Sequence, residues 1–217
     1  MANDYCTWAE IEASNPDITW GATYDTIGAL LVTRASRALD RECKVEPGYF
    51  YVSADTTRWF PGTGGTSIWI GALAAAPTTL SVAEGGDVDT SAGTGGTYTA
   101  WAAADYLLWP PNALLMGEPY RRLDINGSSS GGSKTVFAAG EKTVKIAGKF
   151  GYAVAVPEDI KQATIIQVTR WLQRARQGFQ DTGAIVELGQ LTYTKALDPD
   201  VALMIAHYQR KPRKGSQ

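Results

Sequence analysis

A stretch rich in glycine, threonine and serine separates two segments of helical pattern, and this interruption most constrains the fold. Residues 47–154 hold short aromatic and β-branched runs divided by glycine-rich turn signals, the pattern of strands joined by tight turns. Residues 1–46 and 155–210 carry apolar residues at helical spacing. The sequence therefore predicts an α+β fold, in which N-terminal and C-terminal helices form a small bundle with a large β-rich insertion.

The N-terminal segment predicts two helices. Thr7 and Glu10 have the spacing of a capping box, which begins a helix that Pro16 ends. A second helix is expected over residues 23–43, where apolar residues recur at helical spacing and predict one buried stripe. That stripe consists of Ile27, Leu30, Leu31, Ala35, Ala38 and Leu39.

The C-terminal segment predicts two more helices. Pro157 suits a first helical position, and we expect a helix over residues 157–177. Its wide apolar arc predicts contact both with its own core and with a neighbour; the arc consists of Ile160, Ala163, Ile165, Ile166, Val168, Trp171 and Leu172. A strand is expected over residues 190–194, and Asp198 should cap a last helix. Residues 211–217 are predicted to form a flexible basic tail.

The insertion predicts a series of short strands with turn signals between them. Each candidate strand is rich in aromatic and β-branched residues, which suit a pleated surface. Several short strands at this spacing predict a small sandwich or a barrel-like fold. We expect strands at residues 49–52, 57–60, 67–70, 79–82, 98–101, 121–125 and 143–152.

The net charge and the small number of potential metal ligands exclude several classes of function. Twenty Lys and Arg residues against 22 Asp and Glu residues leave a net charge of −2, which argues against a dedicated nucleic-acid-binding domain. The single histidine, His207, excludes sites that need two histidines, and Cys6 and Cys43 are interpreted as reduced thiols. We therefore expect no cofactor and no metal. The longest apolar stretch, residues 68–76, is shorter than the roughly 20 residues of a membrane helix, so no membrane partner is expected.

Two short motifs formally match catalytic or phosphate-binding patterns. Residues 127–131 match GxSxG around Ser129, but they lie in a run of glycine and serine, and a strand rather than a helix is expected after them. Residues 132–135 resemble the end of a phosphate-binding loop, but the glycine that should precede the lysine is missing. We therefore expect that the protein is not an enzyme.

An alternative interpretation is a β-rich module that binds glycans or calcium. Residues 87–91 place oxygen ligands at alternate positions, as a calcium loop does, but Ala92 and Tyr98 stand where glycine and glutamate are required. Tryptophan rings could stack on sugars, but the helical and strand contexts of these residues favour packing instead. The tryptophans expected to pack are Trp8, Trp20, Trp59, Trp69, Trp101 and Trp171.

Several short passages follow one another in a distinctive order. They are Thr56-Thr57-Arg58-Trp59-Phe60, Pro119-Tyr120-Arg121-Arg122-Leu123, Phe150-Gly151-Tyr152 with the following Val156-Pro157-Glu158-Asp159-Ile160-Lys161-Gln162-Ala163, and Leu197-Asp198-Pro199-Asp200-Val201. In this order, over residues 24–210, the chain resembles the head–tail connector (adaptor) proteins of tailed bacteriophages and related gene-transfer particles.

The resemblance implies a structural role in the virion. Members of this family form a ring, usually of twelve copies, beneath the portal at the capsid vertex. DNA passes through the lumen of the ring without sequence-specific binding. The implied partners are the portal protein, neighbouring adaptor copies, and a stopper or tail-completion protein. The implied location is the neck of the virion, with assembly in the host cytoplasm.

The same resemblance implies roles for individual residues. On the helix expected at residues 157–177, ring packing is expected from Ile160, Ile166, Trp171 and Leu172. Portal binding is expected from the last helix and the basic end of the chain, through Val201, Met204, Ile205, Tyr208, Arg210, Lys211 and Arg213.

Overall fold

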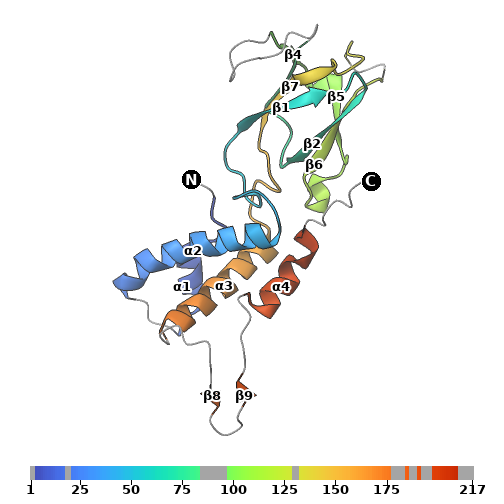
Figure 1. The fold of residues 1–217 in the computed structure, drawn as a ribbon. Helices are drawn as coiled ribbons and strands as arrows, with labels where there is room; N and C mark the ends of the chain where they lie inside the picture. The colour runs from blue at the N-terminus through green and yellow to red at the C-terminus, as the bar shows by residue number, and fades with distance from the viewer. Residues whose placement is uncertain are drawn as a thin grey trace. The chain divides into compact units, whose positions relative to one another are not determined.

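A computed structural model describes residues 3–17, 21–83, 97–128, 132–176, 184–185, 190–191 and 197–209. The chain folds as two compact units (Figure 1). The helical unit comprises Met1–Tyr51 and Val156–Gln217, and the β unit comprises Val52–Ala155. The predicted α+β fold class is confirmed, because the helices come from the two ends of the chain and the antiparallel sheets from its middle.

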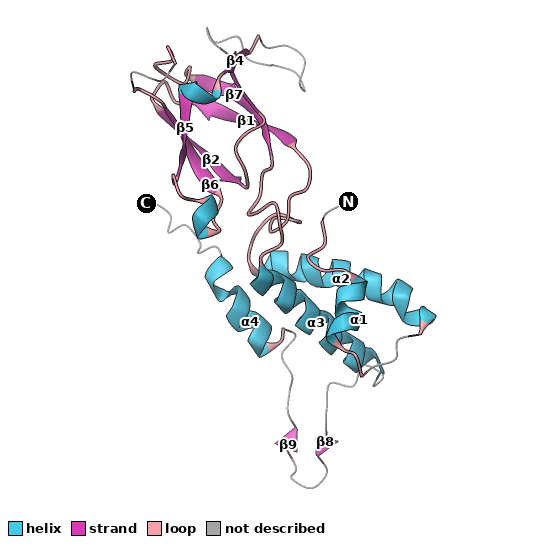
Figure 2. Cartoon of the chain, turned by 180° about the vertical axis from the view of Figure 1, so that it is seen from behind, coloured by secondary structure: helices cyan, strands magenta, loops and turns pink. Residues whose placement is uncertain are grey.

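The described part of the helical unit contains four α-helices (Figure 2): α1 Trp8–Ser14, α2 Ala22–Glu42, α3 Glu158–Arg176 and α4 Pro199–Ile205. The helix α3 packs against the other three. The predicted capping box is present, since the backbone N–H of Thr7 donates to Glu10 Oε2 at 2.7 Å and Glu10 N donates to Thr7 Oγ1 at 3.3 Å. Both termini of the chain thus contribute to one bundle.

The core of this bundle lies between α1, α2 and α3. Side chains from all three helices and from the segment before α1 form one buried apolar cluster: Cys6, Ile11, Val32, Ala35, Ile165, Val168 and Leu172. Trp8 and Trp171 are half-buried and pack against it. The cluster joins segments that are more than 120 residues apart in the sequence, so the bundle forms only when both ends of the chain meet.

The apolar stripe predicted for α2 is wrong in its first half. Ile27 and Leu30 are 44% and 53% exposed, whereas Val32 is buried. The buried face also includes two polar residues, Ser36 and Asp40. Apolar periodicity does not predict a buried face of this kind, because polar residues such as Ser36 and Asp40 can be buried only where the fold supplies hydrogen-bond partners.

The described residues of the β unit form seven strands in two antiparallel sheets. They are β1 Thr56–Gly62, β2 Ser67–Leu73, β3 Thr79–Val82, β4 Thr99–Trp101, β5 Tyr106–Trp109, β6 Tyr120–Ile125 and β7 Gly140–Gly148. The first sheet has the order β1-β7-β3-β4, and the second has the order β2-β6-β5. Buried side chains from both sheets form one apolar cluster between them, which is the arrangement of a small sandwich.

Alternation along the strands accounts for this core. In β2, Ile68 and Ile70 are buried, whereas the intervening Trp69 is exposed. Across the core, the rings of Trp101 and Phe137 stack with centroids 5.0 Å apart. The pairing of β2 with β6 shifts register between Trp69 and Leu73, and Gly71 within this shift has φ +81°, a conformation that favours glycine.

Three strand predictions differ from the structure. Residues 49–50 form a turn and residues 51–52 have no regular secondary structure, so the predicted strand is absent; the rings of Tyr49 and Phe50 pack within the helical unit. The last predicted strand ends at Gly148, with only an isolated bridge between Leu73 and Phe150 beyond it. The strand β5 was not predicted, because its four residues follow a short 3-10 turn rather than a glycine-rich signal.

A short hairpin pairs β8 Ala184–Ile185 with β9 Gln190–Leu191. The strand β9 falls within the strand predicted at residues 190–194, whose remaining residues 192–194 lie outside the described part of the chain.

Candidate assembly surfaces

A buried polar cluster around Asp40 holds the N-terminal segment against α2. The hydroxyl of Tyr5 donates to Asp40 Oδ1, and Gly48 N donates to Asp40 Oδ2 at 3.0 Å. Arg37 Nη1 lies 3.3 Å from the same carboxylate, and Phe50 N donates to the Tyr5 hydroxyl at 3.3 Å. The cluster therefore joins three segments of the chain through one carboxylate.

The electrostatics of the cluster indicate a structural role. Burial raises the pKa of Tyr5, and the Asp40 charge raises it further, so the phenol stays protonated as a donor. Burial also raises the pKa of Asp40, against the opposing effect of the hydrogen bonds from Tyr5 and Gly48. Both side chains are almost completely buried, so no reactant can reach them without opening the fold.

The Phe50 ring connects the Asp40 cluster to the C-terminal end of the helical unit. It makes edge-to-face contacts with Tyr5 at 5.7 Å, with Tyr49 at 5.3 Å and with Tyr208 at 5.2 Å between ring centroids. Tyr208 belongs to the 3-10 turn Ala206–Tyr208 after α4. The end of α4 is thus fixed by aromatic packing.

The start of α4 is anchored to α3 by polar contacts. Asp198 caps α4 by accepting from Asp200 N at 3.0 Å, and Arg170 Nη1 donates to Asp198 Oδ2 at 2.9 Å. Asp198 N also donates to Gln167 Oε1 at 3.2 Å. This ion pair is only 13% and 23% exposed, so salt screens it less than a fully solvated pair.

The structure divides the residues predicted to bind the portal into three groups. Val201 and Ile205 are completely buried and hold α4 on the bundle, whereas Met204 and Tyr208 are half-buried. Arg210, Lys211 and Arg213 lie outside the described residues. Sequence reasoning missed Leu203, which is 78% exposed. Leu203 lies off the apolar face of α4, so the apolar periodicity of the helix did not mark it. The only signal in the sequence was a leucine at a position expected to face solvent.

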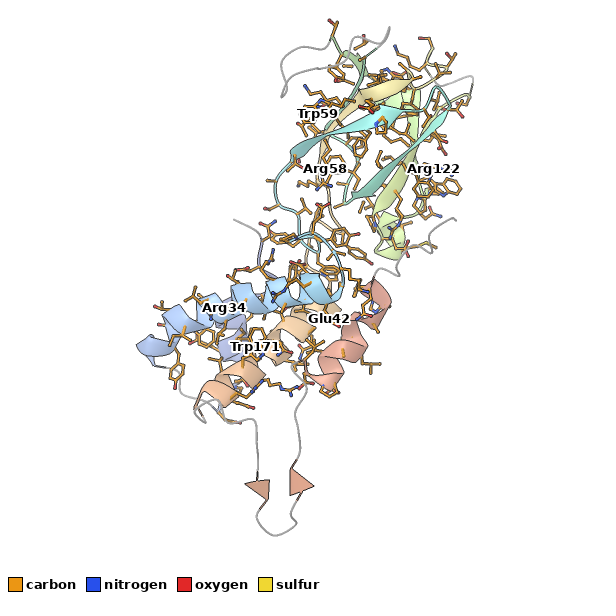
Figure 3. The ribbon with its side chains drawn as sticks, in the orientation of Figure 1. Arg34, Glu42, Arg58, Trp59, Arg122 and Trp171 are labelled. Atoms are coloured by element: carbon orange, nitrogen blue, oxygen red, sulfur yellow. The ribbon has the colours of Figure 1, made fainter. Side chains whose placement is uncertain are left out.

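The four residues predicted for ring packing fall into two groups that differ in burial. Ile160 and Leu172 are buried within the chain, so they hold the bundle itself together. Ile166 and Trp171 are half-buried and keep some surface for a neighbour; Figure 3 shows Trp171 on α3. Ile166 also lines a groove of about 480 Å³ between the end of α1, α3 and the start of α4, together with Asn15, Thr169 and Pro199.

The outer face of α2 carries a second apolar surface on the helical unit. Ile27 and Leu30 lie on the side of the helix opposite the buried Val32 and Leu39, and Arg34 and Arg41 share this exposed side. Figure 3 labels Arg34 on α2. Arginine next to exposed aliphatic residues is typical of protein interfaces. We call Ile27, Leu30, Arg34 and Arg41 the α2 face.

The second sheet of the β unit presents a tryptophan face. In register, Trp69 of β2 pairs with Arg122 of β6, and Arg122 pairs with Trp109 of β5. Paired residues point to the same side of a sheet, and Trp69 and Trp109 are 69% and 48% exposed. The prediction that Trp69 has a buried face in a packed core is therefore wrong, because its neighbours Ile68 and Ile70 face the core instead.

The other motifs singled out in the sequence form no site among the described residues. Ser129, residues 87–91 and Trp20 lie outside the described part of the chain. His207 is exposed, and its Nε2 lies 3.9 Å from Asp159 Oδ2. Within the described residues no group of His, Cys, Asp and Glu could hold a metal ion. In the same residues no helix is both long and apolar enough to cross a bilayer.

Comparison with known proteins places the fold. The sequence matches no protein-family model and no curated protein. Among solved structures, the chain is similar to a chain from the neck of an empty GTA (gene transfer agent) particle computed with C6 symmetry. The two are 16% identical with a TM-score of 0.56, and the similarity covers 100% of both chains. At this identity the comparison establishes a shared fold.

Proposed function

We propose that this chain is a structural protein of a phage-type neck, where it forms the head–tail adaptor ring beneath the portal. The observation that carries the proposal is the shared fold over the whole length of both chains, helical unit and β unit together, with a chain from a GTA neck. The order of sequence passages that resembles head–tail adaptors is an independent argument for the same assignment.

Ring formation requires a surface that contacts neighbouring copies. The α2 face offers exposed aliphatic side chains beside arginines on one helix, and the half-buried Ile166 and Trp171 lie on α3, which packs against α2. A neck with C6 symmetry repeats each unique chain six times, and the ring of twelve copies expected for adaptors is compatible with that symmetry. We propose the α2 face as one contact between copies.

The C-terminal region is proposed to contact the portal. Leu203 projects from α4 with most of its side chain exposed, and the basic residues 210–214 follow along the chain. The opposite side of the ring would receive a stopper or tail-completion protein. The net charge of −2 suits a lumen that lets DNA pass, because a strongly cationic wall would hold phosphates. The location would be the virion neck, with assembly in the host cytoplasm.

The proposal is tested by association with the portal protein of the same particle. Leu203→Glu should weaken portal association at least tenfold in a pull-down, because it places a charge where an apolar contact forms. Ala202→Glu is the matched control, since Ala202 is exposed on the same helix and receives the same charge. A truncation at Pro199 is less informative, because it also deletes the buried Val201 and Ile205.

Two results would contradict the proposal. Wild-type protein that fails to associate with the portal under any assembly condition excludes the adaptor role. Equal association of Leu203→Glu and wild type excludes α4 as the contact.

A further inference from the structure

Among the described residues, the largest group of exposed apolar side chains lies on one sheet of the β unit and on the connection between two of its strands. The strands β2 and β5 expose Trp69, Leu107 and Trp109, and the connection from β5 to β6 exposes Leu114, Leu115 and Met116. We call these six residues the β5 patch. The described part of the helical unit exposes only Ile27, Leu30 and Leu203 among its large hydrophobic residues, so the patch is the larger apolar surface.

The members of the patch are held in a defined arrangement. Trp69, Arg122 and Trp109 form one row across three strands, and Leu107 lies two residues from Trp109 on the same face of β5. The Arg122 guanidinium lies 5.0 Å from the Trp109 ring centroid and its Nη2 donates to Asp124 Oδ2 at 2.8 Å. These contacts restrict Arg122 and Trp109, so ordering them on binding costs little further entropy.

The connection at residues 110–119 is also compact. Met116 N donates to Asn112 O and Ala113 O, both at 3.1 Å, and Glu118 N donates to Ala113 O at 2.8 Å. Gly117 ends this turn in the left-handed conformation with φ +67°. Leu115, at the centre of the turn, is 89% exposed. Three consecutive large apolar residues held outward by a tight turn are typical of a binding surface.

The patch is large enough to supply a substantial part of an interface between proteins. Its two tryptophans can bury about 150–250 Å² each, and its six side chains are 48–89% exposed. A standard protein–protein interface buries roughly 800 Å² on each partner. Tryptophan, arginine and methionine are also the residues that carry most binding energy or are enriched in such interfaces.

The charge of the patch favours a second copy of the chain over nucleic acid. Arg122 and Asp124 on its strands pair at 2.8 Å, and the connection also carries the acidic Glu118, so the patch presents no net positive charge to a phosphate backbone. A patch with so little net charge meets little like-charge repulsion from a copy of itself. If the proposed neck role holds, identical copies lie beside one another around the ring axis.

We infer that the β5 patch, with Trp69, Trp109 and Leu115 as its anchors, is a contact between neighbouring copies of this chain, separate from the α2 face. This inference rests on the proposed function for its choice of neighbour. It assigns to the β unit a direct part in holding the ring together, in addition to the contact made by the helices.

Site-specific cross-linking tests the inference in the full chain. Leu115→Cys, labelled with a benzophenone maleimide, places a photoreactive group at the centre of the patch. The native Cys6 and Cys43 are buried, and burial raises the pKa of each thiol to about 12, so they stay unlabelled at neutral pH. Val136→Cys is the matched control, because Val136 is exposed in the same unit but lies outside the patch.

The expected result is a covalent dimer of this chain from position 115, both at high concentration and after assembly with the portal, and no such dimer from position 136. Trp69→Glu combined with Leu115→Glu should reduce self-association at least tenfold in sedimentation velocity, and Val136→Glu should not. A cross-link within one chain, an adduct with another neck protein, or vesicle binding that Leu115→Glu abolishes would overturn the inference.

The two proposals fail in different ways. If the double variant assembles on the portal as wild type does, the β5 patch is not a copy-to-copy contact, and the adaptor role stands. If wild type self-associates through the patch but never joins the portal, the patch contact stands, and the adaptor role fails.

Discussion

Among the described residues, the helical unit buries four polar side chains, whereas the β unit buries two, Asp105 and Thr143. The buried polar residues of the helical unit are Ser36, Asp40, Thr164 and Gln167. The two units also differ at the surface. Six large apolar side chains are exposed on one sheet of the β unit and on the connection between β5 and β6.

The difference shows how each unit is held together. The bundle joins segments from both ends of the chain, and hydrogen bonds to Asp40 and Gln167 fix how those segments meet. Such contacts are specific but contribute little net energy, because water offers equivalent hydrogen bonds to the unfolded chain. The β unit is a continuous segment, and the cluster between its sheets is built from apolar side chains.

The largest expected effect comes from a deletion in the apolar core of the β unit. Leu123 of β6 is completely buried between the sheets. Leu123→Ala should lower the free energy of unfolding by about 2–5 kcal/mol, because it removes buried methyl groups and leaves a cavity. Hydrogen exchange should show faster amide exchange in β3, β6 and β7. The comparison fails if amides of α2 and α3 lose protection while those of the sheets do not.

A smaller effect is expected from the polar cluster of the helical unit. Asp40→Ala leaves the Tyr5 hydroxyl and Gly48 N–H without their acceptor and should cost about 1–3 kcal/mol. Asp40→Asn retains one acceptor oxygen and should cost less. Chemical denaturation of both variants, followed by circular dichroism of the helices, measures the difference. Equal stability of Asp40→Ala and wild type would show that the cluster does not hold the N-terminal segment.

The smallest effect concerns the surface pair between α1 and α3. Glu10 Oε1 lies 2.7 Å from Lys161 Nζ, and this contact and the Thr7 hydrogen bonds lower the pKa of Glu10 below its ordinary 4.5. Glu10→Gln removes the charge but can keep the capping box. The lowered pKa means that the stabilisation is complete above pH 4.5 and is lost as pH falls through the lowered value.

Thermal unfolding from pH 7 to pH 2 checks this sign. Wild type should be slightly more stable than Glu10→Gln near neutral pH, and the two should converge at acid pH and in high salt. A difference that grows as pH falls would contradict the assigned cause.

The sequence carried enough information for the architecture but not for most of the surface. The capping box at Thr7, the proline before α3 and the alternation in β2 and β3 are local signals, and the structure follows them. The turn at residues 49–50 depends on contacts with Tyr5 and Tyr208, which are distant in sequence. Local propensity cannot report such contacts, so a strand was expected there.

Surface assignments failed for a related reason. Apolar residues at helical spacing on α2 and α4 were assigned to buried or partner-facing stripes, but which side of a helix is buried depends on what packs against it. The buried face of α2 runs through Val32, Leu39 and Asp40, so Ile27 and Leu30 face outward. On α4, Val201 and Ile205 are buried and hold the helix on the bundle. The exposure of Trp69 and Trp109 follows from the pairing of three strands, which one strand's pattern cannot show.

Negative-stain electron microscopy of the purified protein mixed with its portal protein tests the central claim most directly. The account predicts a closed ring of identical copies added to one end of the portal, with a copy number compatible with sixfold symmetry. Portal particles without added density, beside a protein that remains monomeric in the same mixture, would contradict it.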